Sequence, residues 1–178
     1  LEFAENISKV GTQPIIGTQI FFRFEDTTGL LPLIALNEKG YKRIIELSSR
    51  SYLENDAISD PHLDIKEFLG DTEGVLLLSG TIQGLFGKLY KKGRLKEIIQ
   101  LYNQLASKFN NKFYLEIQRH GDPNEIAFEK FNLEHSSKIK IPNIATNEVY
   151  YLTPDMHEAH DALTCIGSKT YVNEKNRI

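Results

Sequence analysis

Cysteine, methionine and tryptophan are nearly absent from this sequence of 178 residues, which has one cysteine, one methionine and no tryptophan. The single cysteine, Cys165, excludes an internal disulfide framework and a zinc site built from several thiolates. A chain without disulfides is typical of a reducing compartment, so we expect a cytoplasmic protein. Cys165 lies in the apolar context LTCI, which predicts a buried and inert thiol.

Long apolar runs and a strong net charge are also missing. No stretch approaches the roughly 18–20 apolar residues that cross a bilayer, so we expect no membrane insertion. The formal net charge of -3 provides no basic field that would hold a phosphate backbone, so we do not expect this segment to be the main binder of DNA. With 40% hydrophobic and 25% charged residues, the composition favours a folded globular chain.

The sequence begins without an initiator methionine and without a signal-peptide pattern of basic and then apolar residues. We therefore expect the chain to be part of a larger polypeptide. Its length favours one domain over two, so residues 1–178 are predicted to form a single domain.

Strands and helices are predicted to alternate along the chain. Several segments carry apolar residues at helical spacing, and short runs of β-branched, aromatic and other apolar residues are bounded by glycine or polar residues. This alternation predicts an α/β fold with mainly parallel strands, in which sites lie at the carboxyl ends of the strands. The predicted strands are 14–17 with 20–24, 30–36, 74–80, 112–118 and 143–146, and the predicted helices end near 10 or cover 37–48, 85–90, 95–109, 124–137 and 154–163.

Local signals refine these boundaries. Residues 26–29 (DTTG) predict a turn, and Pro32 places its strand near a sheet edge or at a strand start. Asn37 is predicted to cap the following helix, and residues 54–61 to form a polar loop. No Walker loop, dinucleotide glycine motif or nucleophile elbow is present, because Gly80, Gly84 and Gly87 have the wrong spacing.

Six segments, taken in order, resemble the polymerase and histidinol phosphatase (PHP) domain of the alpha subunits of bacterial DNA polymerase III. They are residues 13–17 (QPIIG), 36–41 (LNEKGY), 77–80 (LLSG), 113–121 (FYLEIQRHG), 144–152 (IATNEVYYL) and 159–163 (AHDAL). The resemblance covers nearly the whole chain. It implies an incomplete, distorted β/α barrel. The family's amino-terminal portion, which supplies the first strands and the first metal-binding histidines, is missing from this sequence.

In metal-binding members of this family, imidazole, carboxylate and thiolate groups at several strand ends hold divalent ions that activate water for phosphodiester hydrolysis. The resemblance places Gln19 where these relatives carry Glu, Leu30 where they carry His, and Thr81 where they carry Cys. Tyr150 stands in place of another His, and Glu148, in place of Asp, alone retains ligand chemistry. We therefore expect a degenerate metal site, and this chain to have no catalytic, cofactor-binding or metal-binding residues of its own.

Among the histidines, His120 is the best candidate for a site residue, because it follows a predicted strand at the end where α/β folds place chemistry. A hydrogen bond to a loop is the simpler role for this side chain. Glu116 and Arg119, on the same strand, are expected to form an ordinary ion pair. His62 and His135 are expected to have no catalytic role, and the pair His157 and His160, spaced i, i+3 on a helix, is expected to be structural.

The resemblance implies a role in DNA replication, as a scaffold within a polymerase alpha chain and as a docking surface for the proofreading exonuclease subunit of the replicase holoenzyme. Nucleotidyl transfer and its magnesium ions would belong to a palm domain of the parent DNA-directed DNA polymerase, which would also bind the DNA. The alternative is a metal-dependent phosphoesterase or 3'-5' exonuclease with a site rebuilt around Glu148 and His120. A free-standing PHP phosphatase is a third possibility.

Overall fold

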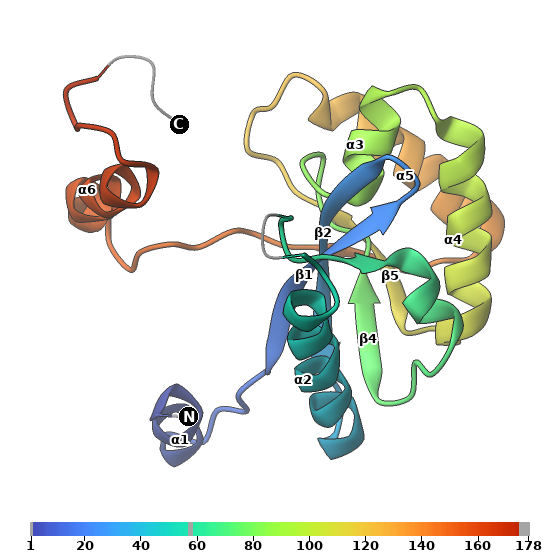
Figure 1. Cartoon of the computed structure of the whole chain (residues 1–178), viewed down its shortest axis with the longest axis horizontal. Coiled ribbons are helices and arrows are strands. Elements are labelled where there is room, and N and C mark those ends of the chain that lie inside the picture. The colour runs from blue at the N-terminus through green and yellow to red at the C-terminus, as the bar shows by residue number, and fades with distance from the viewer. Residues whose placement is uncertain (1, 57–58, 175–178) are drawn as a thin grey trace. The chain divides into compact units, whose positions relative to one another are not determined.

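Helices and strands alternate along the chain in the computed structural model, which describes residues 2–56 and 59–174 (Figure 1). The elements in chain order are α1 (Glu2–Lys9), β1 (Gly17–Phe24), β2 (Thr27–Ala35), α2 (Glu38–Leu53), β3 (Leu63–Asp64), the 3-10 helix η1 (Ile65–Leu69), β4 (Val75–Leu78), α3 (Leu85–Lys91), α4 (Leu95–Phe109), β5 (Phe113–Ile117), α5 (Glu125–Ile139), β6 (Asn143–Ala145), the 3-10 helix η2 (Pro154–Met156) and α6 (His157–Ser168). The predicted α/β class is confirmed.

The strands form one six-stranded sheet in the order β3-β1-β2-β4-β5-β6. β1 and β2 make an antiparallel hairpin, β2 is also antiparallel to β4, and the pairs β1–β3, β4–β5 and β5–β6 are parallel. Among the described strands, β2 alone therefore runs against the others. The carboxyl ends of β4, β5 and β6 consequently meet at one edge of the sheet, where a mainly parallel fold places its sites.

One face of the sheet carries the hydrophobic core. Ile20 pairs with Leu31 and Leu33 pairs with Leu77, and these four side chains are at most 5% exposed. Helices α2, α3, α4 and α5 add further side chains to the buried cluster, and Figure 1 shows α3, α4 and α5 together on one side of the sheet. The alternate residues, such as Phe21, point the other way and are less buried, as the period of a strand requires.

The hairpin corrects two predictions. The turn lies at Glu25 and Asp26 rather than at 26–29, with Glu25 in the left-handed region at a φ of 52°. Gly29 lies inside β2, where a Cβ atom would come within 2.3 Å of the Leu85 backbone nitrogen, so this glycine allows α3 to approach the sheet. Pro32 is not near an edge, because β2 is central. Its missing N–H is tolerated because the β2–β4 register begins only at Leu33.

Helix α2 begins as predicted and ends later. Asn37 is the N-cap, and its side chain accepts a hydrogen bond from the Gly40 backbone N–H at 3.0 Å. The helix continues past residue 48 to Leu53. The predicted loop 54–61 contains residues 57 and 58, which lie outside the described residues.

The chain divides into two compact units, Leu1–Thr146 and Asn147–Ile178, and the prediction of a single domain stays a prediction. In the second unit Pro154 opens the 3-10 turn η2, and α6 follows directly. Cys165 is the buried residue of α6 at 4% exposure, which agrees with the prediction of a buried thiol. No helix of the described chain is both long and apolar enough to cross a bilayer.

Candidate functional site at the strand ends

Ser79 joins the carboxyl ends of β4 and β5. Its side chain is fully buried, and its Oγ accepts a hydrogen bond from the Glu116 backbone N–H at 2.9 Å. The same hydroxyl donates to the Gly80 carbonyl at 3.2 Å. Gly80 has a φ of 75°, a left-handed conformation that favours glycine, and it turns the chain from β4 toward Thr81.

Glu116 is the buried carboxylate of this site, with 5% of its surface exposed. Its Oε1 accepts hydrogen bonds from the Thr146 hydroxyl at 2.5 Å and from the Gln118 amide at 3.2 Å. The Gln118 amide also donates to the Thr146 oxygen at 2.8 Å. The side-chain carbonyl of Gln118 accepts a hydrogen bond of 3.1 Å from the exposed His120 ring. Hydrogen bonds therefore link the buried Glu116 side chain to a surface imidazole.

The loop after β5 is held by Glu125, the first residue of α5. One of its carboxylate oxygens accepts hydrogen bonds from the backbone N–H groups of His120, Gly121 and Asp122 at 2.8, 2.8 and 3.2 Å. Three converging donors satisfy the carboxylate, which is only 9% exposed. The position of His120 is therefore fixed through its backbone, while its ring lies at the surface.

Asp122 and Arg119 carry the remaining charges of the loop. Backbone and side-chain hydrogen bonds from Asn124, together with Lys91, hold the pKa of Asp122 below its usual value. Arg119 donates two hydrogen bonds to Glu129, at 3.0 and 2.7 Å, and this lowers the pKa of the Glu129 carboxyl. The prediction paired Arg119 with Glu116, whereas Arg119 lies beyond the end of β5 at Ile117 and pairs with Glu129 on α5.

A small cavity of about 10 Å³ lies beside these groups, which is close to the room that one water molecule needs. Both polar and apolar side chains line it, from the ends of β4 and β5 and the start of α5: Thr81, Ile82, Glu116, Ile117, Gln118, Glu125, Phe128 and Glu129. The cavity is too small for a nucleotide or a sugar phosphate.

The five positions at which metal-binding relatives carry metal ligands are divided between the two units. Leu30 and Thr81 lie close together, because the Leu30 carbonyl and the Thr81 backbone are each within 3.3 Å of the point where Gly84 would carry a Cβ. Gln19 is exposed on β1, and Leu30 and Thr81 are half-buried. Glu148 and Tyr150 belong to the second unit.

Within that unit the Tyr150 hydroxyl donates to a Glu148 carboxylate oxygen at 2.6 Å, and this hydrogen bond raises the pKa of Tyr150. Glu148, the one inspected position that retains ligand chemistry, thus already accepts a hydrogen bond from Tyr150. Within the ranges 2–56 and 59–174, no three His, Cys, Asp or Glu side chains gather so that they could hold a metal ion.

The other histidines make local contacts. A ring nitrogen of His62 lies 2.8 Å from the Asp60 carbonyl, and one of His135 lies 2.7 Å from the Phe131 carbonyl. His160 packs against the rings of Tyr150 and Tyr151, with centroids 5.2 and 5.6 Å apart. His157 lies 5.9 Å from Tyr151. Each of these rings thus contacts groups that are close to it in the sequence.

Sequence reasoning missed Ser79, Thr146 and Glu125 as members of the strand-end network. A signal was present for Ser79 and Thr146, since each carries a hydroxyl near the carboxyl end of a predicted strand. Glu125 gave the weaker signal of an acidic residue in the first turn of a predicted helix. Their partners lie up to 37 residues away, so the pairing itself was not visible in the sequence.

A family model described as the PHP domain matches residues 1–120. With the α/β sheet and the strand-end site described above, this match shows that the chain belongs to the PHP domain family. Several curated relatives are named DNA polymerase III subunit alpha. The protein of Caulobacter vibrioides is 33% identical over 186 residues, which cover 99% of this chain and 16% of that protein.

Two further relatives carry the same name. The protein of Rickettsia bellii is 34% identical over 98% of this chain and 15% of its own length, and that of Vibrio cholerae is 30% identical over 93% and 15%. The chain thus spans about a sixth of the length of these relatives.

Proposed function

We propose that this chain acts as the PHP domain of a replicative DNA polymerase alpha subunit, that its metal site is degenerate, and that it serves as a scaffold and as a docking surface for the proofreading exonuclease. The observation that carries this proposal is the set of replacements at the inspected ligand positions. Gln19, Leu30, Thr81 and Tyr150 provide amide, apolar, hydroxyl and phenol groups where metal-binding relatives provide anionic or imidazole ligands.

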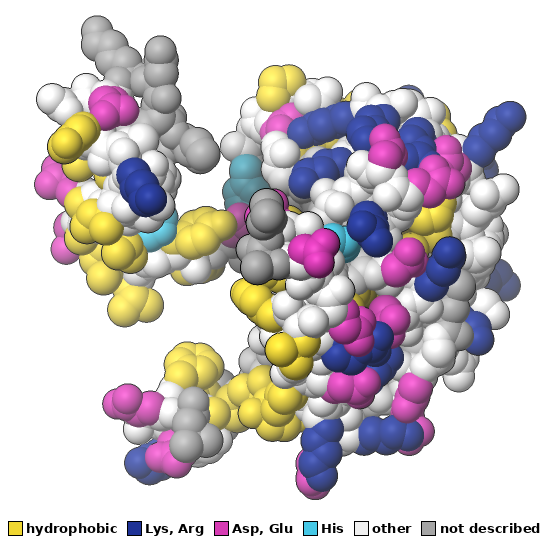
Figure 2. Space-filling view, viewed as in Figure 1, with side chains coloured by type: hydrophobic (Ala, Val, Ile, Leu, Met, Phe, Trp, Pro, Cys, Tyr) yellow, Lys and Arg dark blue, Asp and Glu magenta, His cyan; other side chains and the backbone are white. Residues whose placement is uncertain are grey.

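The charge of the surface does not favour binding of a nucleic acid backbone. On the face in Figure 2, Lys and Arg side chains are interspersed with Asp and Glu. The net charge of -3 likewise gives no basic field. In this proposal DNA and the magnesium ions of nucleotidyl transfer belong to other parts of the parent chain, and the replicase works in the cytoplasm.

The docking part is tested by measuring binding of the purified parent protein to the exonuclease subunit of the same replicase. We expect saturable binding at micromolar concentration or tighter, and competition by an excess of the 178-residue chain. Binding by the parent without such competition would move the docking surface to another domain. No binding at micromolar concentration would overturn the docking role while leaving the family assignment intact.

The metal part is tested by elemental analysis of the same parent protein after purification without chelators. We expect well below one zinc, manganese or iron ion per chain. One or more ions per chain, lost together with phosphodiesterase activity on chelation, would support the second candidate function, a metal-dependent phosphoesterase or 3'-5' exonuclease. That candidate is favoured only by the Glu148 carboxylate and by the place of His120 at a strand end.

A further inference from the structure

Thr146, Glu116 and Gln118 close a triangle of hydrogen bonds where β5 and β6 end. The Thr146 hydroxyl uses its hydrogen toward Glu116 and accepts from Gln118, so its bonding capacity is filled on both sides. The Thr146 backbone N–H also donates to the Ile117 carbonyl at 3.1 Å. We call these three side chains the strand-end clasp.

Strand β6 is a short and mostly exposed edge strand. It has three residues and pairs with β5 alone, at Leu115–Asn143, Glu116–Ile144 and Ile117–Ala145. Asn143 and Ala145 are exposed, so the strand buries little apolar surface. A short edge strand of this kind is marginally stable by itself, so polar contacts at its ends help to hold it.

Both ends of β6 have such contacts. At the start, the Asn143 amide donates to the Ser136 hydroxyl at 2.7 Å, and Ser136 donates to the Ile141 carbonyl at 2.9 Å. At the end stands the clasp, built around a carboxylate that is 95% buried by the sheet and its loops. The clasp contains three side-chain hydrogen bonds and the start of β6 has two, so the clasp is the stronger of the two attachments.

We propose that the strand-end clasp is a conformational device that keeps β6 in register and sets Thr146 as the residue where the chain leaves the sheet, with no metal ion required. The boundary between the two compact units falls directly after Thr146, as this role predicts. Gln118 and Thr146 act as positioning residues, and the exposed His120 is joined to them through the Gln118 carbonyl. The clasp needs only this chain and no exonuclease partner.

The test is hydrogen–deuterium exchange of the parent protein, followed by mass spectrometry at peptide resolution. Thr146→Val keeps the β-branched shape and removes the hydroxyl. We expect amides of residues 143–147 to exchange about ten-fold faster, with less than about a two-fold change at Leu77 and Ser79 in the centre of the sheet. Thr146→Ser keeps the hydroxyl and is expected to restore most of the protection. Thr164→Val, which removes a hydroxyl bonded inside α6, is the matched control.

Three outcomes overturn the proposal. Unchanged exchange at 143–147 in Thr146→Val means that the hydroxyl does not hold the strand. Equal losses in Thr146→Ser and Thr146→Val mean that the methyl group holds it instead. A ten-fold increase in the parent chain on adding a chelator means that a bound metal ion, and not the clasp, orders the strand end.

Global unfolding of Thr146→Val would be recognised by fast exchange at Leu77, and the decision then passes to Gln118→Leu. This variant removes the two bonds donated by the Gln118 amide and the bond from the His120 ring, and it leaves the bond between Thr146 and Glu116. We expect about a three-fold increase confined to 143–147. No increase in Gln118→Leu would overturn the clasp.

Discussion

The Tyr102 hydroxyl on α4 donates a hydrogen bond of 3.0 Å to the Asn132 side-chain oxygen on α5, and both residues are completely buried. The Tyr102 ring also lies 4.8 Å from that of Phe86 and 5.7 Å from that of Phe113. This contact joins two helices that are thirty residues apart in the sequence, within the aromatic part of the core.

Replacing Tyr102 by Phe keeps the ring packing and removes the donor to Asn132. The buried Asn132 oxygen then loses this partner, so we expect a loss of about 1–3 kcal/mol in the free energy of unfolding, measured by urea denaturation. Tyr52→Phe is the matched control, because Tyr52 is 69% exposed on α2, and its effect is expected to stay below about 0.5 kcal/mol. Equal effects of the two variants would contradict a net contribution from the buried hydrogen bond.

The same residue predicts a loss of stability in alkali. Burial raises the pKa of Tyr102 far above its ordinary value of 10.0, so the folded chain keeps this proton at a pH where the unfolded chain releases it. The contribution of the protonated Tyr102 hydroxyl to the free energy of unfolding is therefore fully present below pH 10. It falls as the pH rises above 10, by up to about 1.4 kcal/mol per pH unit. Unfolding free energies from pH 8 to 11 measure this slope. In Tyr102→Phe the slope of the unfolding free energy against pH should be shallower by the share of one proton. Identical slopes in the two proteins would refute the assignment of this loss to Tyr102.

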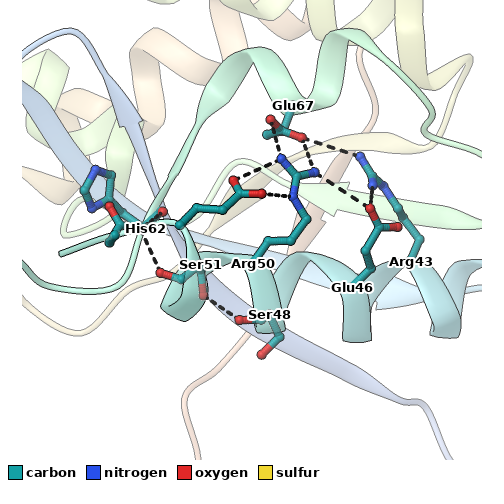
Figure 3. Close-up of polar contacts among 9 residues, drawn as sticks. Arg43, Glu46, Ser48, Arg50, Ser51, His62 and Glu67 are labelled. Carbon is teal, nitrogen blue, oxygen red and sulfur yellow. Dashed lines mark hydrogen bonds and ion pairs between the residues drawn. The ribbon is translucent and has the colours of Figure 1, made fainter. Parts of the chain in front are cut away.

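Arg50 links α2 to η1 in the network of Figure 3. Its guanidinium donates to the two Glu67 oxygens at 2.8 and 3.1 Å and to the two Glu54 oxygens at 2.6 and 3.1 Å. Arg50→Lys keeps the charge and loses the planar fork, so we expect a loss of about 1 kcal/mol in thermal or urea unfolding. Lys42→Met breaks an exposed pair with Glu38 and should cost less than about 0.5 kcal/mol. An Arg50→Lys loss no larger than this would mean that the fork contributes nothing.

Gly29 and Gly167 are predicted to respond in opposite directions to alanine. A Cβ at Gly29 would lie 2.3 Å from the Leu85 nitrogen and 2.4 Å from its Cα, and both are backbone atoms, which cannot rotate away as a side chain can. We expect Gly29→Ala to cost about 3 kcal/mol or more.

Gly167 has nothing within 4 Å and lies in α6, so Gly167→Ala is expected to make this helix more stable by about 0.5–1 kcal/mol. Circular dichroism and urea denaturation check both variants. A tolerated alanine at 29 would show that α3 does not pack against β2 as described.

Much of the fold was predictable because local patterns decide it. The continuous apolar run of β4, the helical stripes of α3 and α4 and the Asn37 cap each depend on residues within a few positions of one another. The hairpin was predicted less well. A glycine that serves a turn and a glycine that serves close packing look alike in sequence, and only the approach of α3 gave Gly29 the second role.

The sequence by itself determined the alternation of strands and helices, the family resemblance and the chemical character of the inspected ligand positions. Only the tertiary structure decided what Glu116 does. The chain suggested the neighbouring Arg119 as its partner, whereas the fold buries Glu116 and brings the Thr146 hydroxyl to it. The reason is physical. A buried carboxylate must find hydrogen-bond donors wherever the sheet brings them, and parallel strands bring together residues that are far apart in the chain.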